Sequence, residues 1–279
     1  MTHASTLAMD LAAHAVAVVT TPMTAAFLVE ATLLGLVAGW AADRIGDNCA
    51  AFLEQGAGAA LRASYCQRCH SPPPWWLHLP LLGPLLAHHR CPTCGLGLHG
   101  LRRPLELVGA IACAAPATVM GPSPQALAVM LAAALLLACL ATDLYASVIP
   151  QPLTAVALWL GLLAAVTGVI PLTTSDAIVG AAAGWIGLRV VQAWGLWSRG
   201  SVSLGDGDLN LLAVGGAWGG LAGVSYALVI GAALAIAHTL YNHARERTAG
   251  ADKPFGPWLA FGIWLVLLVP PMHLLHRLP

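Results

Sequence analysis

Long apolar stretches separated by short polar turns dominate the chain. Clusters of Gly and Pro at 121–124, 171–174 and 215–220 act as turns or helix breaks between them. A helix needs roughly 20 apolar residues to cross a bilayer, so the pattern predicts an all-α polytopic membrane protein with about eight transmembrane helices. The 209–219 run is too short to cross a full bilayer unless it is buried in protein. The predicted spans lie near 25–42, 104–121, 125–142, 153–170, 177–195, 209–219, 222–241 and 257–274.

The composition agrees with a protein that lies in a lipid bilayer. Mean hydropathy is +0.78 and only 9% of the residues are charged, which is far less than in an ordinary soluble domain. The formal net charge is zero and no basic stripe is present. We therefore expect the bilayer, and no nucleic acid, as a partner. The oligomeric state is not indicated.

The positions of the basic residues predict the orientation of the spans. When eight spans are threaded through the bilayer, the Lys and Arg residues of 43–103, 199–208 and 242–256 all fall on one side. Cytoplasmic loops carry such an excess, so that side is the cytoplasm. The chain then divides into an N-terminal segment with the first transmembrane helix at 1–42, a cytoplasmic loop domain at 43–103 and an intramembrane domain at 104–279.

The cytoplasmic loop domain contains two CxxC pairs. Cys66 and Cys69 form the first pair, and Cys91 and Cys94 form the second. Two such pairs about twenty residues apart suit a tetrahedral zinc site with four thiolate ligands, and the reducing cytoplasm argues against disulfides. The sequence therefore predicts a structural zinc knuckle between the first two spans. The alternative is four unrelated thiols.

Acidic residues at the borders of the apolar runs are candidates for function. Asp143 ends one run, and Gly205–Asp208, which contains Asp206 and Asp208, begins another. An ionisable group at the centre of a membrane helix costs about 2.5–3.5 kcal/mol on insertion scales, so such groups usually mark function. The threading places these acids on the same, cytoplasmic side. Taken singly, each could instead cap a helix or lie in solvent at its end.

Two carboxyl groups that share one water molecule can hydrolyse an amide bond. The ionised group takes a proton from the water, and the protonated group polarises the carbonyl and then helps the amine to leave. The glycines on either side of Asp206 allow another chain to approach closely, so an extended peptide could dock along this turn. The sequence has no GxSxG motif. Asp143 and Asp208 are therefore the candidate catalytic residues.

Several short motifs follow one another in a characteristic order. RPLE at 103–106 is similar to an R-x-P-x-x-E region, and DLYASVIP at 143–150 resembles a stretch that carries a first catalytic aspartate. GDGDLNLLA at 205–213 resembles a GxGDxKLLA signature, with Asn210 in place of the lysine, and PFGP at 254–257 precedes the last span. Together with the CxxC pairs, these motifs make the chain resemble the type IV prepilin peptidases, which are intramembrane aspartic proteases of the GxGD class.

This resemblance implies an aspartic endopeptidase of the bacterial inner (cytoplasmic) membrane with Asp143 and Asp208 as its catalytic pair. Its substrates would be type IV prepilins or pseudopilins of a pilus or type II secretion system, cleaved after a glycine at the cytoplasmic membrane face. Bifunctional members then methylate the new N-terminus from S-adenosylmethionine. Glu106 could serve this methylation, or it could pair with Arg102 or Arg103 at a helix end.

Two other classes of protein remain compatible with these residues. An ion- or proton-coupled transporter would use Asp143, Asp208 and Arg189 as a relay, although the internal repeats expected of transporters are not evident. A zinc-stabilised membrane scaffold would use the acids only as helix caps. Asp206 is either a helix cap or a spectator.

Overall fold

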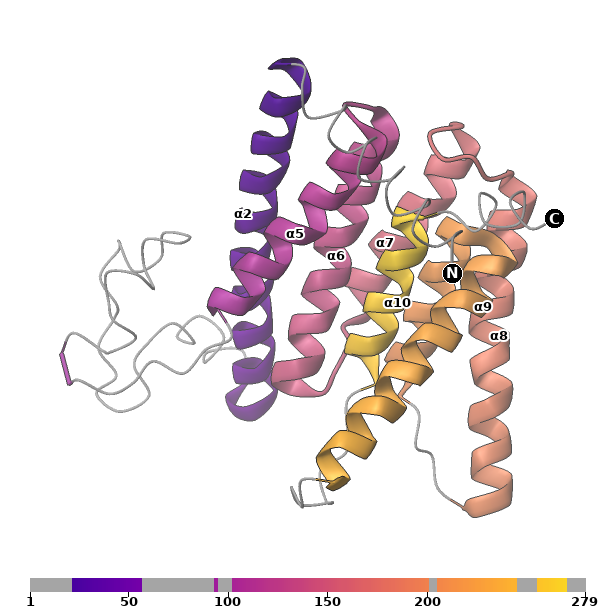
Figure 1. Cartoon of the computed structure of the whole chain (residues 1–279). Helices are drawn as coiled ribbons and strands as arrows, with labels where there is room; N and C mark the ends of the chain where they lie inside the picture. The colour runs from indigo at the N-terminus through magenta and orange to yellow at the C-terminus, as the bar shows by residue number, and fades with distance from the viewer. Residues whose placement is uncertain (1–21, 57–92, 95–101, 201–204, 245–254, 270–279) are drawn as a thin grey trace.

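The computed structural model describes residues 22–56, 93–94, 102–200, 205–244 and 255–269. Within these ranges every regular element is an α-helix (Figure 1), which confirms the predicted all-α class for this part of the chain. The helices in chain order are α2 (Pro22–Gln55), α5 (Arg102–Met120), α6 (Pro124–Ala146), α7 (Gln151–Val166), α8 (Thr174–Arg199), α9 (Asp206–Ala244) and α10 (Gly256–Leu268).

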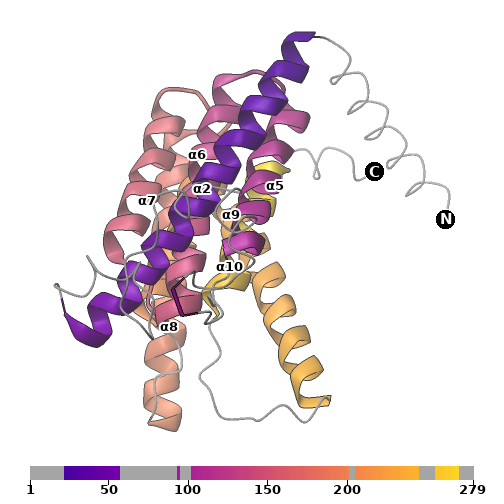
Figure 2. The ribbon, with the colours of Figure 1, turned by 90° about the vertical axis from the view of Figure 1, so that its left-hand side faces the viewer.

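Four of these helices, namely α2, α6, α8 and α9, are long and apolar enough to cross a membrane. The other three, α5, α7 and α10, are shorter apolar helices that pack among them. Figure 2 shows α2 lying across one side of the bundle, where it contacts α5 and α6. The chain is therefore a multi-pass membrane protein, and each predicted run overlaps one of these helices.

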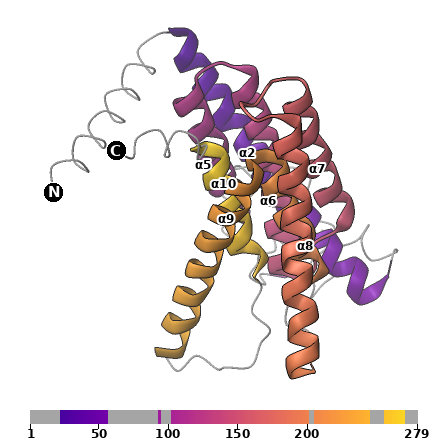
Figure 3. The ribbon, with the colours of Figure 1, turned by 90° about the vertical axis from the view of Figure 1, so that its right-hand side faces the viewer.

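Helix α9 accounts for two of the predicted runs because its backbone reverses at Gly220. This glycine has φ 63° and ψ −160°, which divides the element into two helical arms. A Cβ atom at Gly223 would lie 3.0 Å from the carbonyl oxygen of Gly215, so the second arm begins folded back against the first. Figure 3 shows the long second arm diverging from α8.

The first arm of α9 forms the centre of the bundle, and every residue from Leu211 to Trp218 is buried. It packs against α7, α8 and α10, and the Trp218 indole N–H donates a hydrogen bond of 2.9 Å to the Ala157 carbonyl of α7. Most of the short 209–219 run is thus buried in protein, which is the condition under which so short a segment can cross the bilayer.

Small residues allow the helices to approach closely. A Cβ atom at Gly39 in α2 would lie 2.3 Å from the Leu105 carbonyl oxygen in α5, and one at Gly180 in α8 would lie 2.6 Å from the Gly216 carbonyl oxygen in α9. Such contacts between small residues are the usual basis of helix association in membranes, where lipid is as apolar as the helix surfaces.

The predicted turns at 121–124 and 171–174 are confirmed. Ser123 caps α6 by accepting a hydrogen bond from the Ala126 N–H, and Pro124 occupies the first helical position. Thr173 caps α8 in the same way by accepting from the Asp176 N–H.

Two helices extend further than the hydropathy pattern predicted. Helix α2 continues beyond residue 42 into the segment assigned to the loop domain, and α6 continues beyond residue 142. The predicted spans ended just before Asp43 and Asp143, but Asp43 accepts a hydrogen bond from the Tyr145 hydroxyl and is fully buried. Because this carboxylate is satisfied inside the protein, the helix has no reason to end there.

Candidate active site

Asp143 lies in the last turn of α6, and its side chain is 7% exposed. The helix ends at Ser147, which has the left-handed conformation (φ 50°) and donates its backbone N–H to the Asp143 carbonyl oxygen over 2.9 Å. A left-handed residue that closes a helix in this way is a common C-cap, although glycine usually occupies it. The chain then runs through Ile149 to Pro150 and begins α7.

Asp208 lies in the first turn of α9 and is 8% exposed. Its backbone N–H donates a hydrogen bond of 3.1 Å to the Gly205 carbonyl oxygen, which closes the turn that precedes the helix. A Cβ atom at Gly205 would lie 3.7 Å from Asp208 Oδ2. The turn therefore folds back over the carboxyl group of Asp208.

Asp206 points away from this pair although it is only two residues from Asp208. Its Oδ1 atom accepts hydrogen bonds from Arg189 over 3.3 Å and from Gln192 over 3.1 Å, both on α8. Its side chain is 80% exposed. Asp206 thus links the start of α9 to α8 at the surface.

The start of α10 completes the site. A Cβ atom at Gly256 would lie 2.6 Å from Asp143 Oδ2 and 2.9 Å from Ile149 Cδ1, so only a glycine fits against this carboxyl group without a shift. A Cβ atom at Gly207 would lie 2.8 Å from Ile149 Cβ. The Ile149 side chain therefore lies between the two glycine-containing turns, and three segments far apart in the sequence converge.

Both carboxyl groups lie at this convergence, with Asp143 Oδ2 against Gly256 and Asp208 Oδ2 beside the Gly205 turn. The Oδ2 atom of Asp143 is enclosed and accepts no hydrogen bond from the described residues. This arrangement can supply both a general base and a general acid.

The other predicted site residues are only partly within the described ranges. Cys66, Cys69 and Cys91 lie outside them, whereas Cys94 is half-buried in a turn with Thr93. Over the described residues, no group of three or more His, Cys, Asp or Glu side chains could hold a metal ion. Glu106 is 1% exposed on α5 and lies where α5 packs against Gly39 of α2.

Gly256 and Ile149 were not predicted as site residues. Gly256 belongs to the PFGP motif and Ile149 to the stretch after Asp143, so both were noted only as parts of motifs. The sequence did contain a signal for Gly256, namely a glycine between Phe255 and Pro257 at the start of an apolar run. Its contact with Asp143 requires the three-dimensional arrangement.

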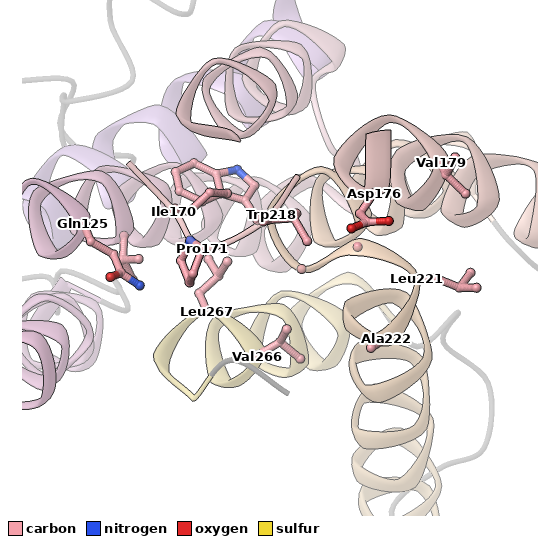
Figure 4. Close-up of a pocket in the computed structure, with 14 residues that line it drawn as sticks. Gln125, Ile170, Pro171, Asp176, Val179, Trp218, Leu221, Ala222, Val266 and Leu267 are labelled. Carbon is pink, nitrogen blue, oxygen red and sulfur yellow. The ribbon is translucent and has the colours of Figure 1, made fainter. Parts of the chain in front are cut away.

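The opposite end of the bundle contains a separate, mainly apolar cavity of about 280 Å³ (Figure 4). It lies beside the Gly220 reversal of α9, between the start of α8 and the end of α10. Asp176 and Gln125 contribute polar atoms, while Ile170, Trp218 and Leu267 provide apolar surface. This cavity includes neither Asp143 nor Asp208.

Comparison with known proteins gives a consistent result. The model of the "Type IV leader peptidase family" matches residues 130–240. A "Prepilin leader peptidase/N-methyltransferase" of Pseudomonas putida is 33% identical over 214 residues, which is 75% of this chain and 72% of that protein. Proteins of the same name from Pseudomonas aeruginosa (33% identical; 74% and 71% covered) and Xanthomonas campestris (31% identical; 69% and 67% covered) also match. No solved structure gives a significant match.

Proposed function

The chain belongs to the type IV leader peptidase family, and we propose that it cleaves the leader peptides of type IV prepilins or pseudopilins with Asp143 and Asp208 as its catalytic carboxyl groups. The observation that carries this proposal is the convergence of two buried acids around Ile149, with Asp143 against Gly256 and Asp208 beside the Gly205 turn. The family model covers both aspartates.

In the proposed mechanism, one aspartate is ionised and removes a proton from a water molecule that attacks the scissile carbonyl carbon. The other aspartate is protonated and donates to the carbonyl oxygen, and the proton gained by the base passes to the leaving amine. The glycine turn at Gly205–Asp208 leaves space for the extended substrate backbone beside the pair. The apolar helix that follows the leader would lie in the bilayer and hold the cleavage site at the cytoplasmic face.

The proposed topology has eight spans, with the two arms of α9 as separate crossings, and the active site on the cytoplasmic side. The reversal at Gly220 supports this topology, because it returns the chain to the side on which α8 ended. The intramembrane domain at 104–279 would then be the peptidase. The segment 43–103 would be a cytoplasmic extension, and its first residues form the last part of α2. The inner membrane is the proposed location.

We also propose that Cys66, Cys69, Cys91 and Cys94 bind one structural zinc ion. The turn at Thr93–Cys94 is consistent with a zinc knuckle, and four thiolates are a suitable donor set for a closed tetrahedral site that does not take part in catalysis. Metal analysis of the purified protein should find about one zinc per chain. A preparation that is active and free of zinc would refute the site.

Methylation of the new N-terminus is the second proposed activity, since the related proteins are named prepilin leader peptidase/N-methyltransferases. S-adenosylmethionine would supply the methyl group. The burial of Glu106 at the contact of α5 with α2 favours a structural role for this residue. Mass spectrometry of the mature pilin should show one added methyl group, and an unmodified terminus would leave the chain a peptidase alone.

The decisive experiment is cleavage of a purified prepilin by the detergent-solubilised protein. The parent should release the leader, whereas Asp143→Ala and Asp208→Ala should each lose at least about a thousandfold in rate, because each variant removes one of the two proton-transfer groups. Cleavage that survives either substitution would exclude the two-aspartate mechanism. The transporter alternative is not supported: Arg189 pairs with Asp206 at the surface, and the relatives are peptidases.

A further inference from the structure

Helix α6 carries a polar contact on the side opposite Asp143. The Tyr145 hydroxyl donates a hydrogen bond of 2.5 Å to Asp43 Oδ1 of α2, across 102 positions of the sequence. Successive residues of a helix are rotated by about 100°, so Tyr145 lies about 200° around the axis from Asp143. The same final turn of α6 therefore faces the active site on one side and α2 on the other.

The packing around this hydrogen bond is close. Asp43 is fully buried, and a Cβ atom at Gly46 would lie 2.5 Å from Tyr145 Cδ2 and 3.1 Å from the Ala141 carbonyl oxygen. The tyrosine ring thus lies directly against the backbone of α2. A hydrogen bond to a buried carboxylate has a defined direction and is stronger than one between neutral groups, so it fixes the ring and the turn that bears it.

The turn needs such support because it is the end of the helix. The last carbonyl groups of an α-helix have no partner within the helix, and α6 ends in the left-handed Ser147, whose N–H bonds back to Asp143. Asp143 therefore lies where the helix would otherwise fray. A displacement of about 1 Å in a catalytic group can reduce a rate by about a hundredfold.

We propose that Asp43 and Tyr145 position Asp143, so that α2 is part of the peptidase although it lies outside the region matched by the family model. This inference rests on the proposed function. Tyr145 acts through the helix and does not touch the substrate. It is a positioning residue for the reaction, and Asp43 is its anchor.

The test compares Tyr145→Phe, Asp43→Asn and the double variant with the parent in prepilin cleavage. Tyr145→Phe removes only the hydroxyl, and kcat should fall about tenfold with KM within twofold of the parent, because the geometry of the acid changes while the substrate contacts do not. The double variant should be no slower than the slower single variant, since residues that act through one contact are not additive. Tyr226→Phe, on the second arm of α9 and 38% exposed, is the matched control.

A readout independent of activity is amide hydrogen exchange. In Tyr145→Phe, the peptide that covers residues 141–149 should exchange faster, while peptides from the start of α6 should be unchanged. Unchanged exchange with kcat within twofold of the parent would overturn the proposal, as would an additive loss in the double variant or an equal loss in Tyr226→Phe. If Tyr145→Phe does not fold, Asp43→Asn must by itself show the fall in kcat and the faster amide exchange of residues 141–149. A parent that does not cleave prepilin would instead refute the proposed function.

Discussion

The two ends of the described helical bundle each contain an aspartate, a backbone irregularity and glycines, yet the aspartates differ in burial and contacts. At the end where α6 stops and α9 begins, Asp143 and Asp208 are both buried, and their segments meet around Ile149. At the other end, Asp176 is exposed beside the Gly220 reversal and the cavity, and its Oδ2 atom accepts a hydrogen bond of 2.7 Å from the Thr173 hydroxyl.

The difference shows what distinguishes a functional acid from a structural one in this fold. Asp176 is paired within its own helical turn with Thr173, which is the usual role of an acid at a helix start. Asp143 is instead buried, and its Oδ2 atom lies against Gly256 at the start of α10. An acid at the end of an apolar run does not by itself indicate a catalytic role. The convergence of two such acids is the informative feature.

Isosteric substitutions at the two ends should give the largest contrast. Asp208→Asn should lower the cleavage rate at least about a thousandfold, because the amide can neither accept nor donate the required proton. Asp176→Asn should leave the rate within twofold of the parent. The measurement is the initial rate of leader release with equal amounts of folded protein. A comparable loss in both variants would show that the acids differ in burial but not in role.

A glycine comparison tests how closely the active-site end is packed. Gly256→Ala would place a methyl group 2.6 Å from Asp143 Oδ2, so the carboxyl group must move, and kcat should fall about a hundredfold. Gly187→Ala, at a position on α8 with no atom within 4 Å of the added Cβ, should keep the parental kcat. If both alanine variants cleave normally, the site is less rigid than the contacts indicate.

The sequence pointed to the acids of the proposed site more readily than to the residues packed around them. The GxGD motif and the acid at 143 stood out because charge is rare in an apolar chain, and in the structure their segments meet around Ile149. Gly256 and Ile149 were not identified as site residues, because their function lies in backbone proximity and shape. The motif around Gly256 was visible in the sequence, but its contact with Asp143 was not.

The helix ends were predicted less well for a related reason. The predicted spans ended at residues 42 and 142, so Asp43 and Asp143 were expected to lie just outside helices. Both instead lie within helices that continue, since other helices bury them or supply a partner, as Tyr145 does for Asp43. The positions 121–124 and 171–174 were predicted correctly, because Ser, Thr, Gly and Pro specify turns locally.

At the cavity end we expect a substitution to lower the stability of the protein without changing its activity. Trp218→Phe removes the hydrogen bond to the Ala157 carbonyl oxygen and should lower the free energy of unfolding by about 1–2 kcal/mol. The cleavage rate per folded molecule should stay within twofold of the parent. Thermal unfolding in detergent measures the first effect, with the 78% exposed Trp197→Phe as control. A fall in kcat at unchanged stability would mean that the two ends are coupled.

The smallest effect is expected at the surface pair beside the active site. Arg189→Gln removes the contact with Asp206, and since both side chains are largely exposed, the loss should be about 0–1 kcal/mol and should diminish in salt. Gln192 still holds Asp206, so Asp208 keeps its place and the cleavage rate should change less than twofold. A larger, salt-dependent fall in rate would show that the start of α9 is positioned from α8. Asp206 would then contribute to the active-site end although it is exposed. The contrast between buried and exposed acids would not hold at the Gly205–Asp208 turn, which contains both Asp206 and Asp208.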